Sequence, residues 1–197
     1  MTAPSDQPTA PPLTLAQAVA HALSRHADHV FSLMGNGNAH LIDALLALGM
    51  PTTQVRHEAA TVASADAYAR ISGGLAIATT TYGAGFTNTL TALAEAAQAR
   101  TPLLLVVGDA PTSGPRPWDV DQEMLGAALG VRTFLLDLDD PHEMVDHAVS
   151  VARRRRRPVV LGIPYDLVTA PVAVAPAHNG DEDIDLADPA VIASLVA

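Results

Sequence analysis

A carboxylate at the start of a helix is the first candidate for chemistry in this sequence. Glu58 follows a short extended piece, Gln54 to Arg56, and opens a helix rich in small residues that we expect from Glu58 to Arg70. Open α/β sheets bind ligands beyond the carboxyl ends of their strands, which is where Glu58 would lie. An acidic residue in a first turn also complements the helix dipole. The position therefore allows both a catalytic role and a purely structural one.

A glycine-containing turn, Gly83 to Gly85, is the second candidate. It lies between a strand expected from Leu75 to Thr81 and a helix expected from Asn88 to Arg100. Glycines there would let the backbone approach a ligand closely. The spacing departs from the dinucleotide-binding fingerprint, because Asn88 stands where glycine or alanine is required. The structural alternative is a tight turn with Thr87 or Asn88 as the helix cap.

These candidates need a scaffold, and the hydrophobic pattern predicts alternating helices and strands. The other expected helices run from Leu15 to His26, Leu41 to Leu48, Met124 to Leu129 and His142 to Arg155. The other expected strands run from His29 to Leu33, Leu103 to Val107, Thr133 to Leu136 and Pro158 to Ile163. Continuous apolar runs suit strands that are buried on both faces. We therefore predict an α/β fold, a doubly wound parallel sheet with helices on both faces in three layers.

The two ends of the chain differ from this pattern. Residues 1–12 are rich in proline and are expected to form a disordered tail, and residues 13–168 are expected to form the domain. Residues 169–187 are expected to be a linker. Residues 188–197 look like the start of a following domain, with Asp188 as N-cap and Pro189 at the first helical position. We therefore expect the functional unit to be larger than this chain.

Composition excludes several classes of function. The 197 residues contain no cysteine, which excludes disulfides, thiolate metal sites and cysteine nucleophiles. A formal net charge of -10 argues against nucleic acid as a partner, and we expect the arginine run 153–157 to be a solvated helix end. No metal-ligand cluster, signal peptide or membrane-spanning run is visible in the sequence, and we expect a cytoplasmic protein with no membrane partner.

Five segments, taken together, resemble motifs of the thiamine diphosphate-dependent enzymes of the acetolactate synthase and benzoylformate decarboxylase type. Residues 30–35 resemble VFGxPG, 56–58 with 66–70 resemble RHE and ADGYAR, 80–88 resemble TSGPGxxN, 119–123 resemble DxFQE, and 157–166 resemble GPVxLxIPxD. Their order and spacing match the family's N-terminal pyrimidine-binding domain. The departures are Met34, Ala67, Tyr82, Ala84 and Asp121. Tyr82 and Asp121 would change the shape and charge of the pocket.

The resemblance implies roles for individual residues. Glu58 matches the catalytic glutamate that hydrogen-bonds the aminopyrimidine ring of the cofactor, and Gly83, Gly85 and Asn88 would also contact or support that ring. We expect Ala59, Ala60 and Val62 to surround Glu58 with apolar groups. The candidates on the substrate side are Asn36, Thr81, Tyr82 and Gln122. Asn36 and Gln122 fit equally well as solvated loop residues, and His57 would either orient Glu58 or pack.

The resemblance also implies partners. The family binds the diphosphate and Mg²⁺ through a separate domain with a GDG…N signature, which these residues lack. We therefore expect a homodimer or tetramer, or a partner subunit that carries that domain. The chain would be a fragment of a longer enzyme, the small subunit of a split 2-oxo acid decarboxylase, or a non-catalytic α/β assembly module. Gln122 favours acetolactate synthase-like carboligation of a 2-oxo acid. The sequence does not determine which 2-oxo acid is the substrate or whether the reaction is a decarboxylation or a carboligation. It also does not determine whether the rest of the enzyme binds a flavin.

Overall fold

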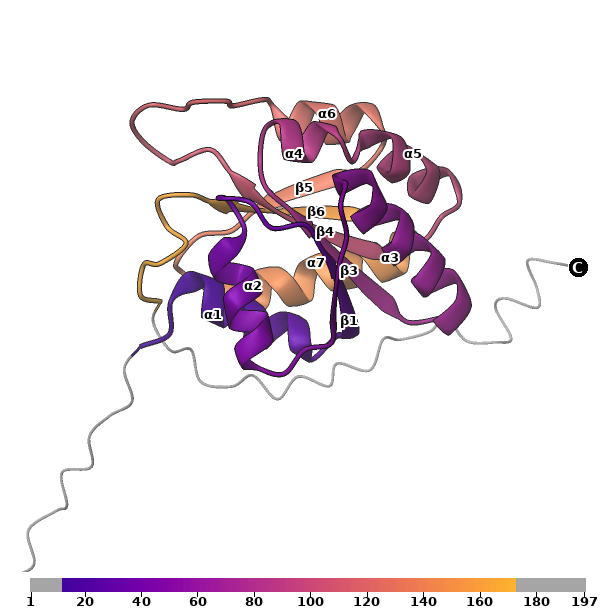
Figure 1. Cartoon of the computed structure of the whole chain (residues 1–197), viewed down its shortest axis with the longest axis horizontal. Coiled ribbons are helices and arrows are strands. Elements are labelled where there is room, and N and C mark those ends of the chain that lie inside the picture. Colours follow the sequence, from indigo (N-terminus) through magenta and orange to yellow (C-terminus); the bar gives the residue numbers. More distant parts are fainter. Residues whose placement is uncertain (1–11, 173–197) are drawn as a thin grey trace, which may run out of the picture.

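The centre of the protein is a parallel β-sheet. The computed structural model describes residues 12–172 (Figure 1). Its six strands follow the order β2-β1-β3-β4-β6-β5, and every neighbouring pair is parallel. The strands are β1 Ala27–Ser32, β2 Thr52–Gln54, β3 Leu75–Thr80, β4 Leu103–Asp109, β5 Arg132–Leu135 and β6 Val159–Pro164. The prediction of a parallel α/β sheet is confirmed.

Helices cover both faces of this sheet (Figure 1). The helices are α1 Leu15–Ser24, α2 Ala39–Ala47, α3 Glu58–Ser72, α4 Ala84–Thr87, α5 Leu90–Gln98, α6 Gln122–Ala128 and α7 Pro141–Arg155. One hydrophobic cluster joins α1, α2 and α7 to one face of the sheet, and a second joins α3, α4 and α5 to the other, with Leu125 of α6 packed against it. The predicted three-layer arrangement is thus also confirmed.

Local sequence explains where several helices begin and end. Thr14 caps α1 in a capping box, since its hydroxyl accepts from Gln17 N and the Gln17 side chain accepts from Thr14 N. Asp140 caps α7, and Pro141 occupies its first turn. Gly73 ends α3 in the left-handed conformation that glycine adopts without strain.

The central strands carry the core. All residues of β3 and β6 are buried, as are the first six residues of β4. These strands read Leu-Ala-Ile-Ala-Thr-Thr, Leu-Leu-Leu-Val-Val-Gly and Val-Val-Leu-Gly-Ile-Pro, without the alternation of a strand that has one face in water. Burial of both faces is therefore what fixes the middle of the sheet.

The segment after β3 differs from the prediction. Gly83 to Gly85 is not a simple tight turn, because Ala84–Thr87 forms the short helix α4 after Gly83. The expectation that Thr87 or Asn88 caps the next helix is also wrong. The N-cap of α5 is Thr89, which makes no side-chain cap bond, while the Thr87 hydroxyl donates to the Ala84 carbonyl at 3.1 Å. One extra helical turn thus separates the glycines from α5 and frees the Asn88 side chain.

The chain ends bear on the expected domain boundaries. The domain start near Leu13 and the boundary at 168 fall within the described residues, whereas most of the expected tail, linker and following helix lies outside them. Past Val168, Pro171 forms an antiparallel bridge with Thr14, and Val172 N donates to the Leu13 carbonyl at 2.9 Å. Among residues 12–172, no helix is long and apolar enough to cross a membrane.

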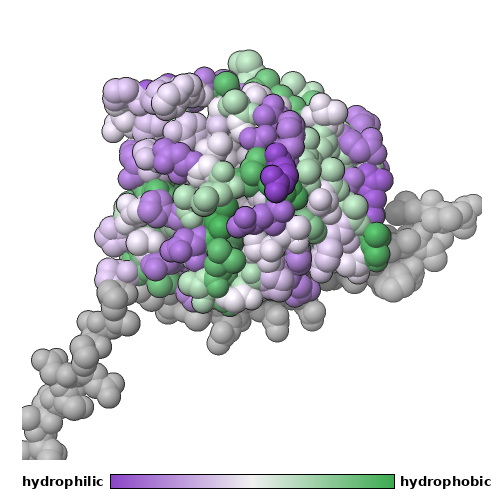
Figure 2. Space-filling view, viewed as in Figure 1, coloured by the Kyte–Doolittle hydropathy of each residue, from purple (hydrophilic) through white to green (hydrophobic). Residues whose placement is uncertain are grey.

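Most of the surface visible in Figure 2 is hydrophilic or intermediate in hydropathy. A hydrophobic strip crosses the region where α2 lies in Figure 1. Leu46 in α2 and Leu48, the C-cap residue that follows this helix, are exposed. This strip is an exposed apolar surface outside the core.

A glycine contact holds the loop after β1 against β4. A Cβ on Gly108 would lie 2.6 Å from the Cα of Gly37. We predict that Gly108→Ala lowers the free energy of unfolding by about 1–3 kcal/mol, because two backbones cannot both stay in place around a methyl group. The matched control is Gly74→Ala, whose methyl group would meet nothing nearer than Ser72 Oγ at 3.5 Å. Urea unfolding measures both variants, and equal stabilities would contradict the contact.

Candidate functional site

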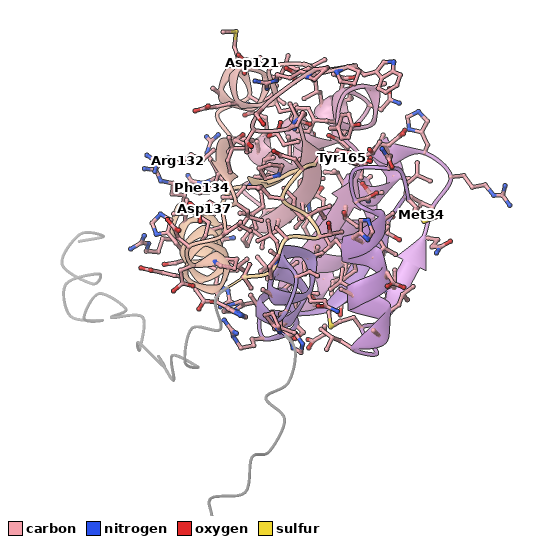
Figure 3. The ribbon with its side chains drawn as sticks, turned by 90° about the vertical axis from the view of Figure 1, so that its left-hand side faces the viewer. Met34, Asp121, Arg132, Phe134, Asp137 and Tyr165 are labelled. Atoms are coloured by element: carbon pink, nitrogen blue, oxygen red, sulfur yellow. The ribbon has the colours of Figure 1, made fainter. Side chains whose placement is uncertain are left out.

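The carboxyl ends of all six strands lie on one edge of the sheet, because every pair is parallel. Figure 3 turns the molecule so that this edge faces the viewer, with Met34 after β1 and Tyr165 after β6. The chain reverses its direction across the sheet between β1 and β3, since β2 lies on one side of β1 and β3 on the other. Such a switch point is where open α/β sheets bind ligands.

Glu58 and Asn88 meet at this edge. Asn88 Nδ2 donates a hydrogen bond to Glu58 Oε2 at 3.0 Å. Glu58 is the first residue of α3, after β2, and Asn88 follows α4, after β3. The extra turn of α4 therefore positions the amide that holds one oxygen of the carboxylate. The other oxygen, Oε1, has no hydrogen-bond partner among residues 12–172.

The immediate surroundings of Glu58 are more open than we expected. Val62 is buried, but Glu58, Ala59 and Ala60 are each only half-buried. His57 neither orients Glu58 by a hydrogen bond nor packs as a core residue. Its exposed ring caps α3 instead, with Nδ1 accepting from Ala59 N at 3.2 Å. The helix start thus fixes the position of Glu58, while its carboxylate stays accessible.

A group of close backbone contacts connects the loops after β1 and β3. Thr81 Oγ1 accepts a hydrogen bond from Gly37 N at 3.0 Å. A Cβ on Gly85 would lie 2.5 Å from Thr81 Cγ2, and a Cβ on Gly37 would lie 2.5 Å from Tyr82 Cδ1. Thr81 thus contacts both Gly37 and Gly85, and Tyr82 contacts Gly37. This closely packed group lies at the same edge of the sheet as the Glu58–Asn88 pair.

Gly83 has a separate role. Its φ is 64°, and a Cβ there would lie 2.5 Å from the carbonyl oxygen of Trp118. Conformation and contact both require glycine. Trp118 is itself 79% exposed with φ 56°, in the loop between β4 and α6. Gly83 therefore packs against this loop, whereas Gly85 packs against Thr81.

The two unusual residues of the motifs have structural partners. The ring of Tyr82 packs edge-on against the ring of Tyr165, with centroids 6.2 Å apart. Asp121 caps α6, since its Oδ1 accepts from Met124 N at 2.7 Å. Tyr82 thus extends the apolar part of this edge, and Asp121 puts its charge at a helix start.

Gln122 is buried, so the expectation that it could be a solvated loop residue is wrong. It is 3% exposed, and its Nε2 donates to the Gly108 carbonyl at 3.1 Å. Its Oε1 is buried without a hydrogen-bond partner in the described residues. Gly108 also contacts Gly37, so the hydrogen bond from Gln122 links its side chain to the closely packed loops through Gly108.

Three polar residues of this edge had no site role in the sequence-based prediction, although Asp166 belongs to the last motif. Asn38 is fully buried, and its Oδ1 accepts a hydrogen bond from Gly35 N. Its Nδ2 donates to the Leu33 carbonyl and to Thr79 Oγ1, so the side chain fixes the loop after β1. Asp109 is half-buried at the end of β4. Asp166 accepts from the backbone and the hydroxyl of Thr112, and these bonds lower its pKa. For Asp109, the signal in the sequence is a polar residue directly after an apolar strand.

Asn36, the substrate-side candidate in the loop after β1, is exposed, whereas Asn38 two residues later is buried.

Asp109 provides a test by pH. Burial raises the pKa of its carboxyl, although a hydrogen bond from Ala110 N at 2.7 Å acts in the opposite direction. The folded protein therefore holds this proton more tightly than the unfolded chain does. The ionised carboxylate costs stability, and this cost appears as pH rises above the unfolded value of about 3.9 and is complete above the raised value.

We predict that Asp109→Asn raises the melting temperature at pH 7 by more than it does at pH 4. Asparagine keeps an oxygen for Ala110 N and removes the charge. Melting curves by circular dichroism at both pH values measure the effect. Asp43→Asn, on the exposed side of α2, is the control. An equal gain at both pH values would show that burial does not act on this carboxyl.

Comparison with known proteins identifies the family. A family model described as "Thiamine pyrophosphate enzyme, N-terminal TPP binding domain" matches residues 13–129. The 2-hydroxyacyl-CoA lyase 2 of Caenorhabditis elegans is 32% identical over 176 residues, 83% of this chain and 28% of that protein. A probable 2-ketoarginine decarboxylase of Pseudomonas aeruginosa is 32% identical over 171 residues, 82% of this chain and 30% of that protein.

The acetolactate synthase of Arthrospira platensis is 31% identical over 179 residues, 85% of this chain and 31% of that protein. The chain thus spans less than a third of the length of these relatives. The family model covers more than half of the chain, and the predicted motifs lie on the loops and helix starts described above. The chain therefore belongs to the thiamine pyrophosphate-dependent enzymes and contains their N-terminal, cofactor-binding domain.

Proposed function

We propose that this chain supplies the pyrimidine-binding side of a thiamine diphosphate site in an enzyme that acts on a 2-oxo acid, with acetolactate synthase-like decarboxylation followed by carboligation. The observation that carries the proposal is the hydrogen bond of 3.0 Å between Asn88 Nδ2 and Glu58 Oε2 at the carboxyl edge of the sheet. It joins the two candidate residues that are 30 positions apart in the sequence. The dipole role of an acidic residue in a first turn does not by itself involve this amide.

The residues fit the aminopyrimidine ring of the cofactor. The ring requires a carboxyl group at one ring nitrogen, and Glu58 offers Oε1 while Asn88 holds Oε2. The half-buried position of Glu58 allows a ligand to reach that oxygen. Gly85 and Gly37 let the neighbouring loops pack closely, because a Cβ on either would strike Thr81 or Tyr82. The site therefore combines an accessible hydrogen-bonding group with closely packed loops.

When bound, the cofactor would supply the chemistry for making and breaking carbon–carbon bonds next to a carbonyl. The contribution of this chain is to hold a proton at Glu58 Oε1 for the aminopyrimidine nitrogen. Asn88 limits the rotation of the carboxylate by holding Oε2. Tyr82, edge-on to Tyr165, would exclude water from the side of the site next to the substrate.

The same edge suits a covering partner. Met34 is 66% exposed, Trp118 is 79% exposed, and Tyr165 is also exposed. Large apolar side chains that stand in solvent at one edge are typical of a surface that another domain covers. We propose that a diphosphate- and Mg²⁺-binding domain, in another protomer of a homodimer or tetramer or in a partner subunit, packs here. Its contact would complete the burial of Glu58.

A second candidate is the cleavage of a 2-hydroxyacyl-CoA. It is supported by the 32% identity of the Caenorhabditis elegans 2-hydroxyacyl-CoA lyase 2 over 83% of this chain. Both candidates use the same cofactor chemistry and the same Glu58. They differ in the group that follows the reacting carbon, which Tyr82 would face in this proposal. Turnover of a 2-oxo acid and of a 2-hydroxyacyl-CoA, measured side by side in the complete enzyme, distinguishes them.

We predict that Glu58→Gln slows exchange of the cofactor C2 proton by about 10²–10⁴-fold, because glutamine cannot hold the proton at Oε1. Hydrogen–deuterium exchange of bound thiamine diphosphate in the complete enzyme measures this rate without knowledge of the substrate. The matched control is Glu143→Gln, since Glu143 is likewise an acidic residue in the first turn of a helix. Equal rates for both variants would leave Glu58 only a dipole role and contradict the proposal.

A further inference from the structure

Six arginines gather at the edge of the sheet opposite Glu58. Arg153 to Arg157 end α7 and precede β6, and Arg132 begins β5. We call these residues the arginine cluster. Arg132 and Arg153 to Arg156 are exposed, and Arg157 is half-buried. Within residues 12–172 none of them forms an ion pair, and the nearby Asp146 is already shared by Arg25 and His26.

Three members of the cluster lie around one hollow. Arg132, Arg155 and Arg157 line one small hollow, together with apolar residues and Gly130, and no carboxylate lines it. A Cβ on Gly130 would lie 2.9 Å from Arg157 Nη1, so that guanidinium packs directly on the glycine. Arg153 Nη2 donates to the His26 carbonyl at 3.4 Å. Like charges held this close favour an anionic partner.

The backbone at Arg156 supports a role for the charge. Arg156 is the C-cap of α7 in the left-handed conformation, with φ 50° and ψ 58°. Glycine or asparagine adopts this conformation with less strain, and glycine is the usual residue there. The chain places a fourth consecutive arginine at this position instead. The strained position thus adds a positive charge where a neutral residue would fit the backbone better.

We propose that residues 181–188, which we call the acidic segment, bind the arginine cluster of the same chain. The acidic segment carries five carboxylates, Asp181, Glu182, Asp183, Asp185 and Asp188, and no basic residue. The arginine run 153–157 carries five guanidinium groups. The chain as a whole is acidic, with a formal net charge of -10. Electrostatic attraction therefore favours the arginine cluster as the place where a negatively charged segment binds.

The acidic segment can reach the cluster. Val172 N bonds the Leu13 carbonyl beside the start of α1, and α1 packs along α7. The 15 residues of α7 span about 22 Å from that level to the arginines. The nine residues that follow Val172, up to Asp181, span up to about 30 Å when extended. The chain is therefore long enough to pass along this face of the sheet.

This contact would direct the chain after Val172 away from the candidate site. Glu58 lies at the carboxyl edge and the cluster at the amino edge. Binding at the amino edge keeps five carboxylates away from the edge that is proposed to receive the aminopyrimidine ring and the diphosphate-binding domain. It also leaves the exposed Met34, Trp118 and Tyr165 free for the covering domain.

The test uses the whole chain, which contains no cysteine. Ser150 lies on α7 four residues before Arg154, and Ile184 is an uncharged residue of the acidic segment. The double variant Ser150→Cys with Ile184→Cys therefore keeps every charge. A short bismaleimide crosslinker is added, and the rate of intrachain crosslinking is measured by mass. The control pairs Ile184→Cys with Asn36→Cys, an exposed position at the opposite edge.

We expect the Ser150 pair to crosslink about tenfold faster than the control pair at low salt, because binding raises the effective concentration of the two thiols. The advantage should disappear in 1 M NaCl, where the Debye length is about 3 Å. It should also disappear when Arg153, Arg154 and Arg155 are changed to Gln, with an unchanged circular dichroism spectrum. Equal rates for the two pairs, an advantage that salt does not reduce, or crosslinks found only between chains would overturn the proposal.

Discussion

Parallel pairing of the strands is the constraint on which the site depends. Because all six strands run in one direction, every loop that follows a strand lies on the same edge. Glu58 follows β2, Thr81 follows β3, and Gln122 follows the loop after β4. Residues that are far apart in the sequence are therefore brought to one edge without any special contact. Burial of β3, β4 and β6 on both faces fixes the sheet that does this.

Close backbone contacts then determine the shape of that edge. Gly37 lies between Thr81, Tyr82 and Gly108, and Gln122 supports Gly108 through a buried amide. These contacts leave no room for side chains between the loops after β1, β3 and β4. The Glu58 carboxylate is held at one oxygen by Asn88 and is accessible at the other. Closely packed loops with one accessible carboxylate are an arrangement suited to a flat, hydrogen-bonding ring.

The sequence predicted the architecture better than the details of the site. Apolar runs and helical spacing predicted β1, β3, β4, β5, β6 and the longer helices, and burial leaves the strongest pattern in β3, β4 and β6. The exposed edge strand β2 was expected only as a short extended piece that overlaps it at Gln54. The short helix α4 was missed because four residues contain no full hydrophobic period. The pairing of Glu58 with Asn88 depends on that helix, so spacing alone could not show it. The burial of Gln122 was also hidden, because it depends on a contact with Gly108 across the fold.

The central claim is that Glu58 donates a hydrogen bond to the aminopyrimidine ring. The most direct measurement is the ¹⁵N NMR shift of the ring nitrogen opposite Glu58, in labelled thiamine diphosphate bound to the complete enzyme. We expect this shift to move toward the value of a protonated nitrogen in the wild type and toward that of the free cofactor in Glu58→Gln. The same shift in both proteins would contradict the role of Glu58.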